Sequence, residues 1–271
     1  ISAYVQGYQV TGDAQYKETA ISAMQFILSK LTTAGGDKLL RVWGKTEGNR
    51  DGLAKLNGYL DDYAFAVAAL LDLASIDANP LWLNKACTFA REMLSQFSDG
   101  DGGFYYTAQD HESLIVRPRS HFDGSIPSGT SLATMSLFRL AAITGDAVFD
   151  QAARAVMRLY GPNLTRLSDQ FANLLNCLDF DLSAPREIAV VLPDQAKEED
   201  YGELLRTLMN RYAPGKVVAL CKESETEKMP GELFKNRYCI DGKPTIYVCR
   251  NFACQKPINT LSALKAEVLD W

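Results

Sequence analysis

Two neighbouring aspartates are the residues of this chain best suited to acid–base chemistry. Asp61 and Asp62 follow the long polar segment 33–57 and open an apolar pattern with helical spacing. Glycoside hydrolysis uses two carboxyl groups roughly 5–9.5 Å apart, one of them raised in pKa. Adjacent residues of a helix point in different directions, so only one of the two can face a shared site, and its partner would be Asp101 or Asp123. Helix capping and the helix dipole explain aspartates at these positions equally well.

Aromatic, basic and hydroxyl side chains near the long polar segments could form the walls of a sugar site. Sugar rings stack on aromatic faces, and arginine binds hydroxyls and carboxylates through its planar fork. The candidates are Arg41, Trp43, Tyr59, Tyr63, Phe104, Arg119 and Ser128. As alternatives, the aromatic rings could anchor loops, Arg119 could neutralise nearby aspartates, and Ser128 could cap a helix.

The histidines and cysteines indicate no metal or cofactor. Both histidines, His111 and His121, lie in the segment 98–127 rather than in a helical pattern, so a solvated loop histidine is the expectation for each. Cys249 and Cys254 have the wide spacing C-x4-C without a histidine nearby, and this is not a C-x-x-C redox motif. We therefore predict that the six cysteines are free thiols and that no metal is bound.

The composition excludes two functional classes. Of the 271 residues, 47% are hydrophobic and 23% are charged, as in ordinary globular proteins. The net charge of −5 offers no basic stripe for nucleic acid. No apolar run approaches the ~18 residues of a membrane span, and no secretory signal is visible. We expect a cytoplasmic protein that binds neither nucleic acid nor membranes.

A motif that recurs three times indicates stacked helical hairpins. The copies at 11–16, 77–82 and 144–149 are about 66 residues apart, and each opens an amphipathic helical pattern. Such repeats bury their apolar faces only against neighbours. Helices are expected at about 1–10, 15–32, 58–76, 80–97, 128–143, 146–160 and 164–182.

The connections between these helices alternate between short and long. Short turns fall at 11–14, 77–79 and 144–145, whereas 33–57 and 98–127 are long and polar. In an up-and-down array, alternate connections emerge at opposite ends, so both long segments should share one rim. Long loops in compact domains usually carry function, which makes that rim the candidate site.

After Pro185 the pattern changes to strands. Runs at 187–192, 217–220 and 245–249 are typical of buried strands, with helical patterns at 199–213 and 259–269. A helical pattern between two strands predicts a βαβ unit with parallel strands. We therefore divide the chain into a helical part, 1–183, and a small α/β domain, 184–271.

Five longer motifs occur in order at 58–64, 101–104, 114–119, 123–129 and 247–254. Together they resemble the C-terminal part of the spermatogenesis-associated protein 20 family. The resemblance implies an N-terminal thioredoxin-like domain followed by an (α/α) toroid like that of six-hairpin glycosidases. By this resemblance the chain is a mainly α protein, an incomplete (α/α) toroid followed by the small α/β domain, and it lacks the thioredoxin-like domain and the first hairpins.

Two hypotheses for function follow. In the first, the rim with the long loops binds a sugar or glycan, and the protein acts as a hydrolase or isomerase. In the second, the chain is a non-catalytic scaffold or interaction module that works with the thioredoxin-like redox domain. In either case the missing hairpins should leave apolar surface, which predicts self-association of the fragment or coverage by the rest of the protein.

Overall fold

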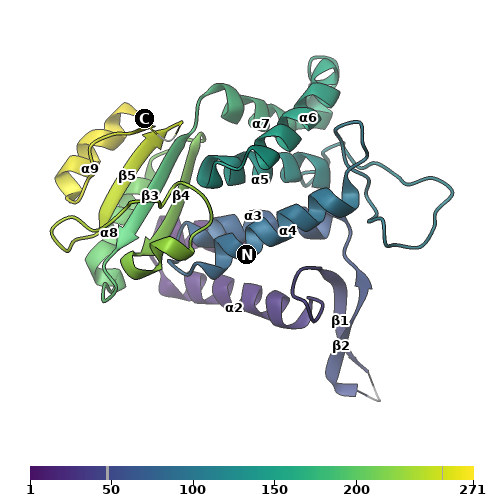
Figure 1. Ribbon diagram of the computed structural model, residues 1–271, viewed down its shortest axis with the longest axis horizontal. Helices are drawn as coiled ribbons and strands as arrows, with labels where there is room; N and C mark the ends of the chain where they lie inside the picture. The colour runs from purple at the N-terminus through teal and green to yellow at the C-terminus, as the bar shows by residue number, and fades with distance from the viewer. Residues whose placement is uncertain (47–48, 252) are drawn as a thin grey trace.

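The computed structural model describes residues 1–46, 49–251 and 253–271, and it is mainly helical with two small sheets (Figure 1). The helices of the first part are α1 (Ser2–Thr11), α2 (Ala14–Lys30), α3 (Leu60–Ala74), α4 (Leu81–Phe97), α5 (Gly129–Thr144), α6 (Ala147–Leu164) and α7 (Ala172–Leu182). They lie close to the predicted ranges, except that a single helix at 164–182 is wrong. There α6 continues to Leu164, and a short 3-10 turn (Ser168–Phe171) precedes α7.

The helices form two layers, which their burial distinguishes. In α3, 11 of 15 residues are buried, and in α5, 12 of 16. The outer helices α4 and α6 bury only 8 of 17 and 5 of 18 residues, each on one stripe. The inner helices α3 and α5 contact each other directly, and the alanines of α3 and the alanine, serine and threonine side chains of α5 are small enough to allow that approach. In the hairpins α3–α4 and α5–α6, the first helix is therefore the inner one and the second is the outer one.

The repeated motif is a turn whose polar groups are satisfied locally. Gly12 and Gly145 end α1 and α5 with φ of 73° and 70°, a left-handed conformation that favours glycine. Asp13 and Asp146 then cap α2 and α6, each accepting a hydrogen bond from the main-chain amide two residues on. The first and third copies thus stop one helix and start the next by the same bonds.

The middle copy makes an equivalent turn with different residues. Asn79 accepts a hydrogen bond from the amide of Leu81 at 3.0 Å, at the start of α4. The indole of Trp82 donates to Asp77 at 2.7 Å, and its ring is fully buried. The aromatic position of the repeat therefore fixes this turn from the core side.

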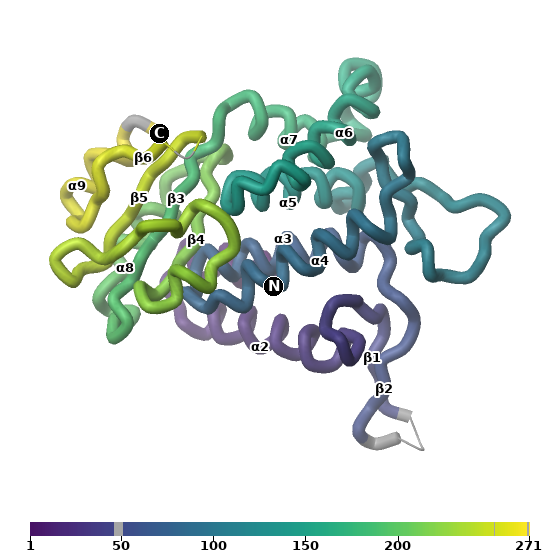
Figure 2. The backbone as a smooth tube through the Cα atoms, in the orientation of Figure 1, coloured from purple at the N-terminus to yellow at the C-terminus, as the bar shows by residue number. Residues whose placement is uncertain are grey.

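The two long connections lie at the opposite end of the helices from the short turns (Figures 1 and 2). The first contains a hairpin that the sequence analysis did not predict, β1 (Leu40–Thr46) paired antiparallel with β2 (Asn49–Asn57). The second, 98–127, folds back against it, and Lys38 Nζ lies 2.7 Å from Asp110 Oδ2. The expected meeting of the two long segments at one rim is therefore what the structure has.

The second part of the chain forms a four-stranded sheet in the order β4-β3-β5-β6. Its elements are β3 (Arg186–Leu192), α8 (Glu198–Asn210), β4 (Lys216–Lys222), a 3-10 turn (Glu223–Lys228), β5 (Thr245–Arg250), β6 (Ala253–Cys254), α9 (Leu261–Glu267) and a last 3-10 turn (Val268–Asp270). The strands β3 and β4 are parallel, as the βαβ prediction requires, whereas β5 runs antiparallel to β3.

The sheet packs on the short-turn end of the helices (Figure 1). Gly231, with φ of 81°, lies directly against the main chain of Thr144 at the third repeat turn. Tyr8 of α1 donates a hydrogen bond of 2.5 Å to Glu198 of α8. One hydrophobic core runs through the helices and the sheet without a break. Across the described ranges, every helix is too short or too polar to span a bilayer.

The prediction of six free thiols is wrong. Cys249 and Cys254 form a disulfide, because β5 and β6 place these two residues directly opposite each other in an antiparallel pair. The C-x4-C spacing alone does not reveal this strand pairing. The four free cysteines are Cys87, Cys177, Cys221 and Cys239.

Candidate functional site

A cavity of about 570 Å³ opens at the rim with the long connections, between α2, β1 and α3. Its wall is mostly apolar, with Met24, Ile27, Leu31, Leu40, Phe65, Ala66, Ala69 and Ile126 among its residues. The charged side chains of Arg41, Asp61 and Asp62 also line the cavity. Sites for small molecules commonly have this composition, an apolar surface with a few polar groups.

Asp62 caps the N-terminus of α3. Its Oδ2 accepts a hydrogen bond from the amide of Tyr59 at 2.8 Å, which caps the helix. The same oxygen lies 3.0 Å from Nη1 of Arg41, and the Arg41 guanidinium lies 4.6 Å above the Tyr59 ring. Asp62 therefore has the capping role proposed as the alternative, and it also holds Arg41 at the mouth of the cavity.

Asp61 is the carboxyl group of the cavity that has an oxygen available for a further hydrogen bond. Its Oδ1 is buried and makes no hydrogen bond of normal geometry to the described residues. Helix α5 starts beside it at Gly129, where any side-chain carbon would overlap that oxygen. Burial, and then the charge of Asp62, raise the pKa of Asp61, against the lowering by the Gly129 amide and Arg41. Asp61 is therefore the carboxyl group best placed to hold or exchange a proton.

Asp123 is a structural clamp rather than a partner of Asp61. Its Oδ1 accepts hydrogen bonds from the amide of Ser128 at 2.8 Å and the hydroxyl of Ser131 at 2.5 Å. Its Oδ2 accepts from the amide of Asn173 at 2.8 Å. Asp123 thus ties the end of the second long connection to α5 and α7, and it does not line the cavity.

Asp101 also lies outside the cavity. Its side chain is 67% exposed and pairs with Nη2 of Arg119 at 2.8 Å. The same guanidinium contacts the fully buried Asp99 at 3.0 Å, and Asp99 accepts hydrogen bonds from the amides of Asp101 and Gly103. Asp99 was among the nearby aspartates that Arg119 was expected to neutralise, and the alternation of aspartate and glycine from 99 to 103 is typical of such an Asx turn. Arg119 therefore neutralises aspartates, which was the alternative to substrate binding.

Three aromatic candidates anchor the loops. Trp43 packs edge-on against Phe26 at 5.3 Å, within the hairpin region. Tyr63 is 3% exposed, and its hydroxyl accepts a hydrogen bond from the amide of Leu39 at 2.9 Å. Phe104 is 2% exposed in the core. None of these three rings lines the cavity.

Ser128 caps α5. Its hydroxyl accepts a hydrogen bond from the amide of Ser131 at 3.1 Å, so it has the capping role. Of the predicted site residues, the structure therefore gathers Arg41, Asp61 and Asp62 at the cavity, with Tyr59 beneath Arg41. It places the remaining predicted residues in the framework around them.

The apolar wall of the cavity was not predicted from the sequence. Asp61, Phe65 and Ala69 follow one another at four-residue intervals on α3, so they share one face of the helix. This spacing was available in the sequence and could have linked the wall to Asp61. The contribution of Ile126 had no such signal, because it depends on how the second long connection folds back.

The two histidines are packed against aromatic rings outside the cavity. His121 stacks on Tyr160 at 4.9 Å, and burial, followed by the charge of Arg119, lowers its pKa. His111 lies edge-on to Tyr59 at 4.9 Å. In the parts of the chain that the structure describes, no three histidine, cysteine or acidic side chains gather as metal ligands.

Comparison with known proteins supports the resemblance drawn from the motifs. No family model matches the chain. Spermatogenesis-associated protein 20 of Rattus norvegicus is 26% identical over 205 residues, which are 74% of this chain and 26% of that protein. The Homo sapiens protein of the same name is 25% identical over 264 residues, 94% of this chain and 33% of its own length. An uncharacterized protein of Caenorhabditis elegans is 24% identical over 98% of this chain and 36% of its own length.

The chain is thus similar over most of its length to proteins named spermatogenesis-associated protein 20, and it spans about a third of their length. Those names state no reaction and no ligand. The chemistry of the site must therefore be argued from the cavity itself.

Proposed function

We propose that the cavity binds a small hydroxylated ligand of the sugar class and that Asp61 is its acid–base group. The observation that carries the proposal is the unpartnered, buried Oδ1 of Asp61 in a cavity with Arg41 at its mouth and an apolar wall opposite. A sugar ring has one apolar face and a rim of hydroxyls, so it matches a site with an apolar wall and a few polar groups.

A single acid–base group favours an isomerase over a hydrolase. Hydrolysis of a glycosidic bond uses two carboxyl groups on either side of it. Here Asp62 is bound to Arg41 and the helix start, Asp101 to Arg119, and Asp123 to three hydrogen-bond donors. Asp61 alone can accept a proton from a bound sugar and return it, which is sufficient for an isomerisation.

The arrangement of the helices supports the proposal that this part belongs to an (α/α) toroid. The hairpins α3–α4 and α5–α6 each supply one largely buried inner helix and one outer helix buried on a single stripe, as a ring of helical hairpins requires. The long connections then belong to the rim of the ring, where the cavity opens. Further hairpins, for which the relatives have the additional length, would close the ring.

A binding screen tests the proposed site. Monosaccharides and short glycans are titrated against this chain and against a full-length relative, with binding followed by calorimetry or ligand-observed NMR. For a sugar that binds in this screen, we expect Asp61→Asn to weaken binding about tenfold, because a buried hydrogen bond to a charged group contributes about 1.5–3 kcal/mol. Asp101→Asn, an exposed site outside the cavity, is the matched control and should bind like the wild type.

Two results would contradict the proposal. One is that no sugar of the screen binds to either of the two proteins titrated. The other is that the two variants lose affinity equally, which would place the ligand away from Asp61.

The second candidate function is a non-catalytic scaffold, and exposed apolar side chains at the mouth of the cavity favour it. Phe65 and Ile126 both line the cavity and expose large parts of their side chains. If this face is a docking surface, sedimentation velocity should show self-association of this chain that Phe65→Ser weakens. A monomer at all concentrations would contradict the scaffold.

A further inference from the structure

The disulfide between Cys249 and Cys254 lies on the last strand pair of the sheet, far from the cavity in the fold. Cys249 is near the end of β5, and Cys254 is in the two-residue strand β6, the outermost strand of its sheet. The link closes a ring of only a few residues, and short rings remove little entropy from the unfolded chain. A bond at this place contributes less to stability than a long-range disulfide, so breaking it would cost the fold little.

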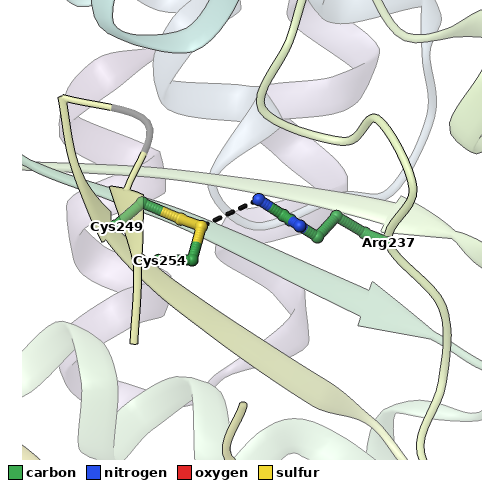
Figure 3. The surroundings of a disulfide bond; sticks show 3 residues. All are labelled: Arg237, Cys249 and Cys254. Carbon is green, nitrogen blue, oxygen red and sulfur yellow. Dashed lines mark hydrogen bonds between the residues drawn. A yellow bond between two sulfur atoms is a disulfide. The ribbon is translucent and has the colours of Figure 1, made fainter. Parts of the chain in front are cut away.

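A positive charge lies against one of the two sulfur atoms. Nη2 of Arg237 is 2.8 Å from Sγ of Cys254, as Figure 3 shows, and the guanidinium lies 5.0 Å above the Tyr247 ring. Its Nε is buried and has no hydrogen-bond partner within the described residues. A guanidinium at this distance gains little from a neutral disulfide sulfur, but it stabilises a thiolate strongly.

The surroundings of the two sulfurs differ in accessibility and in charge. Cys249 is 1% exposed, whereas Cys254 is only partly buried. Glu187 of β3 is directly opposite Cys249 in the sheet, which puts a carboxyl group on that side and a guanidinium on the other. An incoming thiol can therefore reach Cys254 more easily, and Cys254 is the sulfur that can hold a negative charge.

The four free cysteines differ from this pair. Burial raises the pKa of Cys87 to about 11 and that of Cys221 to about 12, and it also raises the pKa of Cys177. Burial, and then the charge of Glu223, raise the pKa of Cys239 to about 12. These thiols are poor nucleophiles at neutral pH, because the thiolate is the reactive form.

We propose that Cys249 and Cys254 form a reversible redox couple that exchanges with a dithiol protein, with Cys254 as the attacked sulfur and Arg237 as its positioning residue. This inference is independent of the proposed sugar site. It gives the C-terminal sheet a chemical role of its own.

The exchange proceeds in two steps. A thiolate of the dithiol partner attacks Sγ of Cys254, the bond between the two cysteines breaks, and Cys249 leaves with the electron pair and takes a proton from water. The second thiol of the partner then loses its proton and attacks the partner's own sulfur in the mixed disulfide, which releases Cys254 as a thiolate beside Arg237. Two electrons pass from the partner, which becomes a disulfide, to the pair, which becomes a dithiol.

A redox titration tests the couple. The protein is equilibrated with mixtures of reduced and oxidised dithiothreitol, the free thiols are alkylated, and the disulfide fraction is read by mass spectrometry. We expect reversible exchange, and we expect Arg237→Gln to shift the equilibrium about tenfold toward the disulfide, because the reduced form loses its charge-assisted contact. Arg237→Lys should give a smaller shift, and Arg158→Gln, an exposed arginine on α6, should give none.

Two outcomes of this titration overturn the proposal. The first is that the disulfide stays oxidised in excess dithiothreitol while circular dichroism shows a folded protein, or that the protein unfolds when the disulfide is reduced. The second is an equilibrium unchanged by Arg237→Gln. Because the wild-type titration decides the first question, the test does not depend on any variant folding.

A second measurement tests the role of Cys254. Cys249→Ser leaves Cys254 free, and Cys254→Ser leaves the buried Cys249 free. With the disulfide reagent DTNB, after subtraction of the rate of the double variant, we expect Cys254 to react at least tenfold faster than Cys249. The reverse order would overturn the assignment of the attacked sulfur.

Discussion

The two ends of the helical part differ in how their polar groups are satisfied. At the short-turn end, each repeat turn closes its own hydrogen bonds within a few residues, and the sheet packs on top. At the end with the long connections, partners come from far apart in the sequence, as in the bonds of Lys38 to Asp110 and Asp123 to Asn173. This second end also holds Asp61, the cavity carboxyl group whose Oδ1 has no normal hydrogen bond to the described residues.

The difference separates structural from candidate functional roles. The repeat turns, whose hydrogen bonds are closed within each turn, form the regular surface on which the sheet packs. At the end with the long connections, most charged groups hold the two connections together, whereas Asp61 lies at a cavity. Substitutions at the two ends should therefore differ in size and, for the aspartates, in sign.

The largest expected effect is at the contact between the sheet and the third repeat turn. Gly231→Ala would place a carbon into the main chain of Thr144, at a position whose φ is 81°. We expect this substitution to lower the free energy of unfolding by about 3 kcal/mol, the upper part of the range for overpacking. Urea unfolding followed by circular dichroism measures the change.

Gly242→Ala is the matched control for this contact. Gly242 also has a left-handed φ, of 64°, but an added carbon there would meet no atom within 4 Å. The free energy of unfolding should then fall only by the backbone strain of an alanine in this conformation, about 1–2 kcal/mol. Equal losses in the two variants would show that the sheet does not rest on the repeat turn.

The next effect concerns the middle turn, which has Ala78 where the other two copies have glycine and is held by the hydrogen bond from the Trp82 indole to Asp77. Trp82→Phe keeps most of the buried ring but removes the hydrogen bond to Asp77, so we expect a loss of about 1–2 kcal/mol in the free energy of unfolding. Trp43→Phe, in the hairpin at the other end, should cost less because that ring is only half-buried. A larger loss at Trp43 would reverse the comparison.

The sequence predicted the short-turn end well, because its signals are local. Glycine in a left-handed turn and aspartate two residues before an amide lie within one six-residue motif, and together with the apolar spacing they placed six of the seven predicted helices close to their observed ranges. The parallel strands β3 and β4 were predicted for the same reason, since their apolar runs are continuous. The meeting of the two long connections followed from the alternation of connection lengths.

The rest depended on contacts that a local pattern does not contain. Asp123 has the same type of side chain as Asp61, and only the fold shows that its oxygens are occupied by three donors. The hairpin of β1 and β2 lies in a polar, glycine-containing segment with a weak strand pattern. The disulfide required knowledge that β6 pairs with β5 in register.

A smaller effect, with a definite pH dependence, is expected at the cap of α6. Hydrogen bonding to the Val148 amide, and then to Arg91, lowers the pKa of Asp146 below its ordinary value of 3.8. An acid whose pKa is lowered by folding stabilises the protein above its unfolded pKa, and this contribution is lost as the pH falls through the lower, folded pKa.

Asp146→Asn keeps an oxygen that can cap the helix and removes only the charge. We expect the variant to be about 0.5–1 kcal/mol less stable at pH 7, a modest value because the ion pair with Arg91 is solvent-exposed. The difference from the wild type should vanish as the pH falls below 3.8. A difference that is constant with pH would show that the charge is not the cause.

The smallest expected effect has the opposite sign and lies at the other end. Because folding raises the pKa of Asp61, the folded state binds its proton more tightly, and stability is lost as the pH rises from 3.8 through the folded pKa. Asp61→Asn removes this loss, so we expect the variant to be about 0.5 kcal/mol more stable than the wild type at pH 7. Urea unfolding at pH 7 and at pH values below 3.8 should show the gain only at the higher pH. A variant that is less stable at pH 7 would mean that the Asp61 charge has a stabilising partner, and the carboxyl group would then be structural, like Asp62 and Asp123.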